Sequence, residues 1–273
     1  MFRAELIALT TTTATKVAAA VAVIGLILTQ LTFVTVLPAL ARGDIGPGAE
    51  ALGSDFPILD LTSAASQLDT LNPLGASMGS SSIGVALIAI VLLGVLAGTS
   101  DDRYGGIVGA VLASPRRGRI VLGKAGAVGL IGLIVGAVMA VAALITLLGT
   151  LAVTGTPFTA AIGDVVATLG RGVFAIAGLA LIGLAVGILV RTQLAGVLTM
   201  IAILFVEPIV AATTQLVSGT SPLWTQFLPV ALAQNVIHGG SAVLNPVVAL
   251  VALAALTVAA LAAASVALAR RDI

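Results

Sequence analysis

Residues 99–124 read TSDDRYGGIVGAVLASPRRGRIVLGK and form a long polar interruption whose flanking segments are both hydrophobic enough to span a membrane. The stretch holds five of the twelve basic residues against two aspartates, while the whole chain has a formal net charge of +1. An excess of Lys and Arg in a short loop between two spans marks its cytoplasmic side, because translocating it is unfavourable. The segment therefore indicates an all-α integral membrane protein and sets its orientation.

A short apolar face lies within this basic segment. Ile107, Val108, Val111 and Leu112 recur at helical spacing, and the following Ser114-Pro115 ends the helix because proline cannot donate the next backbone hydrogen bond. The pattern predicts a short helix lying beneath the membrane. A solvated basic loop that only fixes the topology is the alternative.

The end of the segment imitates a phosphate-binding loop. Gly118 to Lys124 satisfies G-x-x-x-x-G-K, but Ala125 stands where such a loop needs a Ser or Thr hydroxyl for Mg²⁺. No strand precedes the motif, and Lys124 is expected to open a membrane span. We therefore expect no ATP binding by this chain.

Composition limits the remaining possibilities. The 273 residues are 59% hydrophobic and 8% charged, with a mean hydropathy of +1.23, far from the roughly 25% charged of a soluble domain. The chain has no cysteine and one histidine, which excludes disulfides, thiol catalysis and multi-histidine metal sites. The near-zero net charge argues against a nucleic-acid partner.

Long uncharged runs predict six membrane spans in a single transmembrane domain, residues 1–273. The first run has 24 uncharged residues, which cross a hydrocarbon core of about 30 Å with some tilt. The predicted spans are about 17–40, 80–99, 125–153, 165–190, 194–217 and 245–269.

The connecting segments complete the predicted topology. Residues 1–16 suggest an interfacial amphipathic helix, with a frayed terminus as the alternative. Residues 41–79 predict an external loop with a short helix near 61–71. Residues 218–244 predict re-entrant helices between spans five and six, with His238 on the polar surface. Because the cytoplasmic segment 99–124 follows span two, both termini are expected in the cytoplasm.

Three ionisable residues stand inside or near predicted spans. Asp164 and Arg171, seven residues apart, are expected to reach the interface, with a role in a pore as the alternative. Glu207 is the one deeply placed acid and a candidate for a translocation site. Pro208 is expected to disturb the helix there, so a structural or capping role for Glu207 is an equal alternative.

Glycines at four-residue spacing predict close helix packing. Gly94/Gly98 lie in span two, Gly132/Gly136 in span three and Gly183/Gly187 in span four. Such pairs let helix backbones approach closely in a membrane. We interpret them as packing positions and not as a site.

The central segment resembles the cytoplasmic coupling segment of type-2 ABC-transporter permeases, the six-span export class. Members of that class show an acidic stretch after span two, a short amphipathic helix, then a proline with basic residues leading into span three. The resemblance extends to Arg3-Ala4-Glu5-Leu6 as an interfacial elbow helix, to Glu207-Pro208, and to residues 222–238 as re-entrant helices. The residues matching the coupling segment are Asp101, Asp102, Gly105, Ile107, Val108, Val111, Leu112, Pro115, Arg116, Arg117 and Arg119, followed by Gly123-Lys124.

The resemblance implies the permease subunit of an ATP-driven exporter in the plasma membrane, multi-pass, with both termini cytoplasmic. It implies a homodimer of permease chains and two copies of a cytoplasmic ABC ATPase, which carries the ATP and Mg²⁺, so this chain is not itself an enzyme. The apolar span faces favour an amphipathic or apolar substrate such as a lipid, drug or peptide, with membrane lipid as a further partner. The alternatives are a secondary transporter that is proton-coupled through Glu207 and a non-transport membrane assembly subunit.

Overall fold

The computed structural model describes residues 2–46, 61–75, 83–104, 117–220, 222–238 and 244–270, and all regular elements in these ranges are helices. For residues 101–104 and Arg117 the description covers the backbone alone. Five helical stretches in the described chain are long and apolar enough to cross a membrane, which makes this a multi-pass helical membrane protein. They are Thr13–Arg42, Gly118–Thr154, Ile162–Val190, Gln193–Ser218 and Pro246–Ala269.

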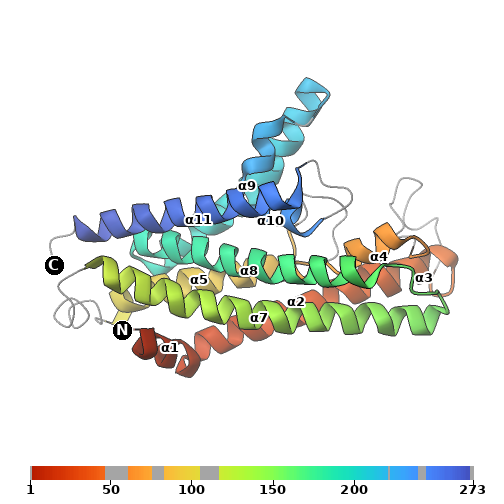
Figure 1. The fold of residues 1–273 in the computed structure, drawn as a ribbon, viewed down its shortest axis with the longest axis horizontal. Coiled ribbons are helices and arrows are strands. Elements are labelled where there is room, and N and C mark those ends of the chain that lie inside the picture. The colour runs from red at the N-terminus through yellow and green to blue at the C-terminus, as the bar shows by residue number, and fades with distance from the viewer. Residues whose placement is uncertain are drawn as a thin grey trace.

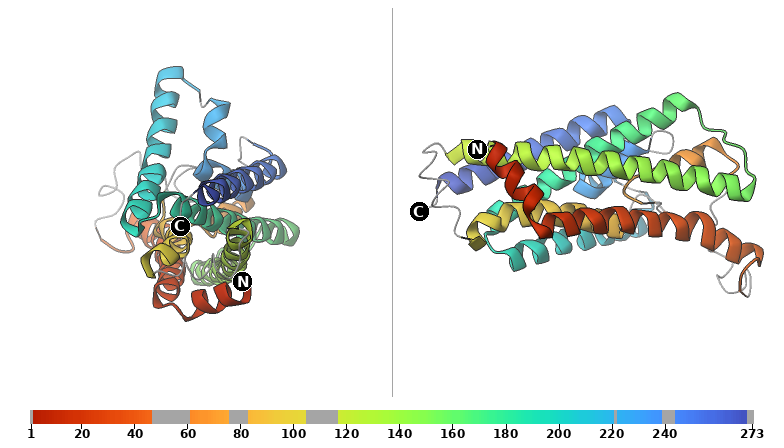
Figure 2. Two further views of the ribbon diagram at one scale, coloured as in Figure 1. Left: turned by 90° about the vertical axis from the view of Figure 1, so that its left-hand side faces the viewer. Right: turned by 90° about the horizontal axis from the view of Figure 1, so that it is seen from below.

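The long helices form an elongated bundle (Figure 1). Helices α2, α5, α7, α8 and α11 run roughly along one axis, and α9 diverges from it, as the end-on view in Figure 2 shows. Helix α1 and the end of α11 lie at the same end of the bundle. In chain order the elements are α1 (Phe2–Thr11), α2 (Thr13–Leu31), the π-helix η1 (Thr32–Val36), α3 (Leu37–Arg42), α4 (Ala64–Thr70), α5 (Val85–Tyr104), α7 (Arg117–Thr154), α8 (Ile162–Val190), α9 (Gln193–Ser218), the 3₁₀-helix η3 (Leu223–Phe227), α10 (Pro229–Ile237) and α11 (Pro246–Ala269).

Helix α5 lies at the centre of the bundle, where it packs against α8. The predicted glycine pairs Gly94/Gly98 and Gly183/Gly187 face each other at this crossing, which confirms their interpretation as packing positions. A Cβ atom added to Gly187 would lie 2.6 Å from the carbonyl oxygen of Val95 and 3.1 Å from the Cα of Gly98. The two backbones are therefore in direct contact, which larger residues would prevent.

Helix α7 begins earlier than predicted. It starts at Arg117 and not near residue 125, and its 38 residues make it about 57 Å long, nearly twice the hydrocarbon thickness. Its first two turns therefore extend beyond the apolar run, because strong helix formers such as Leu122 and Lys124 continue the helix outside it. The motif Gly118 to Lys124 is helical, whereas a phosphate-binding loop surrounds its ligand with non-helical backbone.

Helix α9 is continuous from Gln193 to Ser218, with Pro208 inside it. Pro208 therefore does not break the helix. Proline removes one backbone hydrogen bond, but a helix in an apolar environment retains all its other internal bonds and continues. In the first span the backbone does change: the π-helical turn η1 ends at Val36, two residues before Pro38 in the first turn of α3.

Candidate functional site

The predicted coupling segment lies between the end of α5 and the start of α7. Most of its candidate residues lie outside the described residues, so their contacts stay predictions. Arg119, in the first turn of α7, is described and is exposed. The residues without described side chains are Asp101, Asp102, Gly105, Ile107, Val108, Val111, Leu112, Pro115, Arg116 and Arg117.

Lys124 joins the two helices that flank this segment to the N-terminal helix. Its ammonium Nζ lies 3.1 Å from Oε2 of Glu5 in α1, 3.4 Å from the carbonyl oxygen of Ala97 and 3.5 Å from Oγ of Ser100, both in α5. The side chain of Lys124 is only 6% exposed. Its charge is therefore neutralised by protein groups, which argues against a role in holding a phosphate.

Glu207 caps the short helix α10. Its two carboxylate oxygens accept hydrogen bonds from the backbone N–H groups of Val230, at 3.0 Å, and Ala231, at 2.6 Å. Pro229 has no N–H, so these are the first two donors of α10 without a partner inside the helix. A negative charge here also interacts favourably with the positive end of the helix dipole. This geometry favours the capping interpretation of Glu207.

Arg171 lies at the opposite end of the same short helix. Its Nη2 donates to the carbonyl oxygen of Ile237, the last residue of α10, at 3.3 Å, and to Oγ1 of Thr168 at the same distance. A cation at a helix C-terminus complements the helix dipole. The Arg171 side chain is partly buried and Asp164 is exposed, so the expectation that both reach the membrane interface stays a prediction. Helix α10 is thus held between an acid from α9 and a base from α8.

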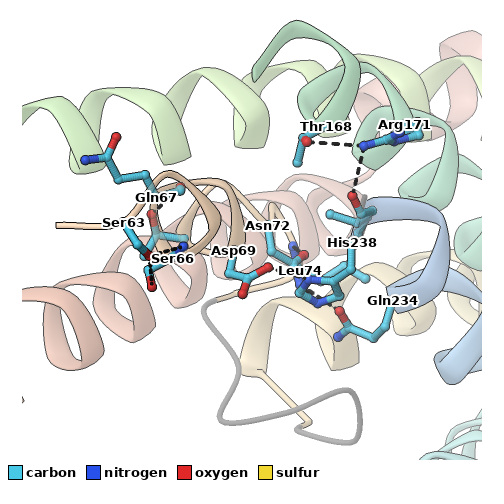
Figure 3. A network of polar contacts seen from close by, with 12 residues as sticks. Ser63, Ser66, Gln67, Asp69, Asn72, Leu74, Thr168, Arg171, Gln234 and His238 are labelled. Atoms are coloured by element: carbon cyan, nitrogen blue, oxygen red, sulfur yellow. Dashed lines mark hydrogen bonds and ion pairs between the residues drawn. The ribbon is translucent and has the colours of Figure 1, made fainter. Parts of the chain in front are cut away.

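A polar network connects α10 to the end of α4 (Figure 3). Nδ2 of Asn72 donates to Oε1 of Gln234 at 2.6 Å, and Nδ1 of His238 lies 3.0 Å from Oδ1 of Asp69. Asn72 and Gln234 are almost completely buried, and the His238 side chain is 12% exposed. His238 was predicted to lie on the polar surface, and that prediction is wrong because most of its side chain is shielded from solvent.

Gln67, on α4, fastens this helix to the turn between α7 and α8. Its Nε2 donates to the carbonyl oxygens of Leu61 and Pro157, each at 2.9 Å. Its Oε1 accepts from the backbone N–H groups of Thr159 and Ala160, at 2.8 and 3.1 Å. A single buried amide thus satisfies four backbone groups, so α4 is a fixed part of the bundle.

These contacts hold helices together and do not form a recognisable catalytic constellation. In the part of the chain that the structure describes, no group of three or more His, Cys, Asp or Glu side chains is placed to hold a metal ion. The imidazole of His238 contacts the carboxylate of Asp69 and the amide of Asn72, and among the described residues no hydroxyl nucleophile is bonded to it. The geometry supports a structural and not a chemical role for this network.

A scan of the chain against protein-family models gives no match, and a search among curated proteins finds no significant similarity.

Proposed function

We propose that the chain is the membrane-spanning permease subunit of an ATP-driven exporter, similar to the type-2 ABC class. Two permease chains would enclose the substrate path, and two copies of a separate cytoplasmic ABC ATPase would bind the segment between α5 and α7. The substrate would be an amphipathic or apolar molecule such as a lipid, drug or peptide.

The observation that supports the proposal is the contact of Lys124 with α5, which connects the two helices that flank the segment. Its two flanking helices are tied together by the buried ammonium of Lys124, so the segment begins and ends on a rigid base. A short helix on such a base would transmit a displacement to both flanking helices, which is what coupling to an ATPase requires. A loop that only fixes topology needs no such base.

The same arrangement supports a six-span topology with both termini in the cytoplasm. In this proposal α5 is span two, although its apolar part, Val85–Ser100, is shorter than the five long apolar stretches. Arg3, Arg119 and Arg270 belong to the elements at the end of the bundle where the basic segment emerges. That end would be cytoplasmic. Elements η3 and α10 would enter the outer leaflet without crossing it.

The ATPase-binding role of the segment can be tested by replacing both Val111 and Leu112 with Asp. Two charges on a face buried against the ATPase cost several kcal/mol when they are unpaired, and a tenfold loss of affinity needs only about 1.4 kcal/mol. We expect the double variant to lose co-purification with the proposed ABC ATPase subunit, or to lose its effect on MgATP hydrolysis by that subunit. A matched control places two Asp residues at Phe158 and Thr159, in the exposed turn at the other end of the bundle. Full binding and coupled export by the Val111/Leu112 variant would refute the proposal for this segment.

A further inference from the structure

We propose that the contact between His238 and Asp69 makes the attachment of α4 to α10 sensitive to protons, so that acid holds the C-terminal end of α10 more firmly. The contact joins two segments far apart in the chain, the end of α4 and the residue that follows α10. It rests on the proposed function only for the side of the membrane that supplies the protons. The response itself depends neither on the topology nor on an ATPase.

The contact lies near one face of the membrane. Helix α4 is at the end of the bundle away from both termini (Figure 1). The neighbouring Arg171 is separated from the opposite end of α8, at Val190, by about 28 Å of helix, close to the hydrocarbon thickness of about 30 Å. The side chain of Asp69 is 44% exposed, so solvent reaches it. In the proposed topology this face is the outer one, and external protons would reach the contact.

The imidazole of His238 lies beside two side chains of the segment that contains α4 (Figure 3). Its Nδ1 is 3.0 Å from Oδ1 of Asp69, and its Nε2 is 3.5 Å from Nδ2 of Asn72. The amide of Asn72 is fixed by two other bonds, because Nδ2 donates to Gln234 and Oδ1 accepts from the Leu74 N–H. A donor therefore faces Nε2, and the arrangement fits a neutral imidazole that donates from Nδ1 and accepts at Nε2.

A proton added at Nε2 changes the two contacts of His238 in opposite directions. The bond to Asp69 becomes charge-assisted, and such bonds are roughly twice as strong as neutral ones. The contact with Asn72 loses its acceptor, but at 3.5 Å it is at the limit of a hydrogen bond and contributes little. We therefore expect the gain at Asp69 to exceed the loss at Asn72.

Charged groups on the other elements decide the sign of the effect. Among the described residues, α8 brings Arg171, which donates to the last carbonyl of α10, next to His238. A positive imidazole is repelled by Arg171 and attracted by Asp69. Asp69 contacts the ring itself, whereas Arg171 contacts the neighbouring backbone, so the attraction is the larger effect. Elements α11 and η3, which pack against α10, contain no ionisable residue, and Glu207 of α9 binds the opposite end of α10.

A restraint at the C-terminal end of α10 reaches other helices. Arg171 joins this end to α8, and Glu207 joins the N-terminal end to α9. Helix α4 is itself fixed by Gln67 to the turn between α7 and α8. A firmer contact of His238 with Asp69 would therefore restrain α8, α9 and α10 together at this face of the membrane.

The test measures hydrogen exchange of the full chain in phosphatidylcholine nanodiscs, where both membrane faces meet the same buffer. Amides in the last turn of α10 report on the contact, because the His238 N–H donates to the Gln234 carbonyl at 2.9 Å. Their protection factors, which are corrected for the intrinsic pH dependence of exchange, are compared between about pH 5 and 8, the range in which histidine side chains change charge. We expect protection to rise about threefold to tenfold toward acid. Solvent around Asp69 limits the gain.

Two variants remove the two charges one at a time. Asp69→Asn keeps an oxygen that can accept from Nδ1 but has no negative charge, and His238→Gln has no group that titrates in this range. We expect both variants to lose the pH response. The matched control is Asp164→Asn, which removes an exposed acid from the first turn of α8. We expect this control to keep the response of the parent chain.

Protection in the parent chain that stays constant with pH, or falls toward acid, would overturn the inference. The parent's response in Asp69→Asn or His238→Gln would also overturn it, because the proton would then act elsewhere. Failure of the proposed function gives a different result. If the chain binds no ATPase, or if cysteine labelling shows the opposite topology, the pH response in nanodiscs still remains.

Discussion

Replacing Glu207 with Gln should detach the first turn of α10 from α9. The amide has nearly the same shape as the carboxylate but one acceptor oxygen in place of two. One of the two bonds, to Val230 or to Ala231, is therefore lost, and an NH₂ group then faces a backbone N–H. The change also removes the negative charge from the N-terminal end of the helix.

The magnitude follows from these two losses. A hydrogen bond to a charged group contributes about 1.5–3 kcal/mol, and a charge at a helix terminus about 0.5–1 kcal/mol more. Glu207 is only 6% exposed, so solvent does not replace the lost partner. We expect the free energy of local opening of the first turn of α10 to fall by about 2–4 kcal/mol.

Hydrogen exchange of the Val230 and Ala231 amides is the direct assay. Each 1.4 kcal/mol is a factor of ten, so their exchange should accelerate roughly 30-fold to 700-fold if it occurs by local opening. A matched control is Thr213→Val on α9, the helix that carries Glu207. Thr213 is exposed, and its hydroxyl bonds to the Ile209 carbonyl. In this control we expect the opening free energy at the Val230 and Ala231 amides to change by less than about 0.5 kcal/mol. Unaltered amide protection in Glu207→Gln would refute the capping argument and favour a transport role for this acid.

Three further predictions concern packing, the buried network and topology. Gly183→Val should prevent folding or lower the thermal unfolding temperature strongly, because an added Cβ would clash with the Val91 carbonyl oxygen, whereas Gly149→Val, where nothing lies within 4 Å, should not. Asn72→Leu should destabilise the chain by about 1–3 kcal/mol in thermal or denaturant unfolding, because the buried Gln234 loses its donor; unchanged stability would show that this contact is not needed. Single cysteines introduced into the cysteine-free chain should react with an impermeant external thiol reagent on the predicted outer side and not on the cytoplasmic side, and the reverse pattern would refute the topology. The outer positions are Ser54 and Ser241, and the cytoplasmic position is Ser114.

The charged contacts of α10 explain why a membrane protein of this composition keeps Arg171 and Glu207 in or near its long helices. Charges in apolar surroundings are costly unless they are compensated. Here the compensation comes from the two ends of one short helix, whose backbone donors and acceptors would otherwise lack partners. The acid and the base are thus each bonded to one end of α10.

Sequence reasoning identified the long apolar helices and their close packing because both depend on local properties. Transfer of an apolar run into a membrane is a sum over consecutive residues, so a stretch such as Pro246–Ala269 is recognisable by itself. The glycine pairs in α5 and α8 were recognised by spacing alone, since only the smallest residue lets two backbones touch.

The candidate site was less predictable. Glu207 stood out as an acid in an apolar run, but the sequence left a translocation role and a structural or capping role as equal alternatives. Its partners lie 23 and 24 residues further along, in a segment whose helix is only nine residues long. His238 carried no signal of burial, because Asp69 is 169 residues away in the chain.

The sequence alone determined that the chain enters a membrane, that the segment 99–124 is basic, and which glycines allow close helix packing. These properties follow from composition and from residue spacing along one helix. Only the tertiary structure decided that Lys124 joins α1, α5 and α7, that Glu207 and Arg171 bind the two ends of α10, and that His238 lies against Asp69. The physical reason is that a buried charge or amide is stabilised by whichever distant group the fold brings within about 3 Å, and that distance is not encoded in local periodicity.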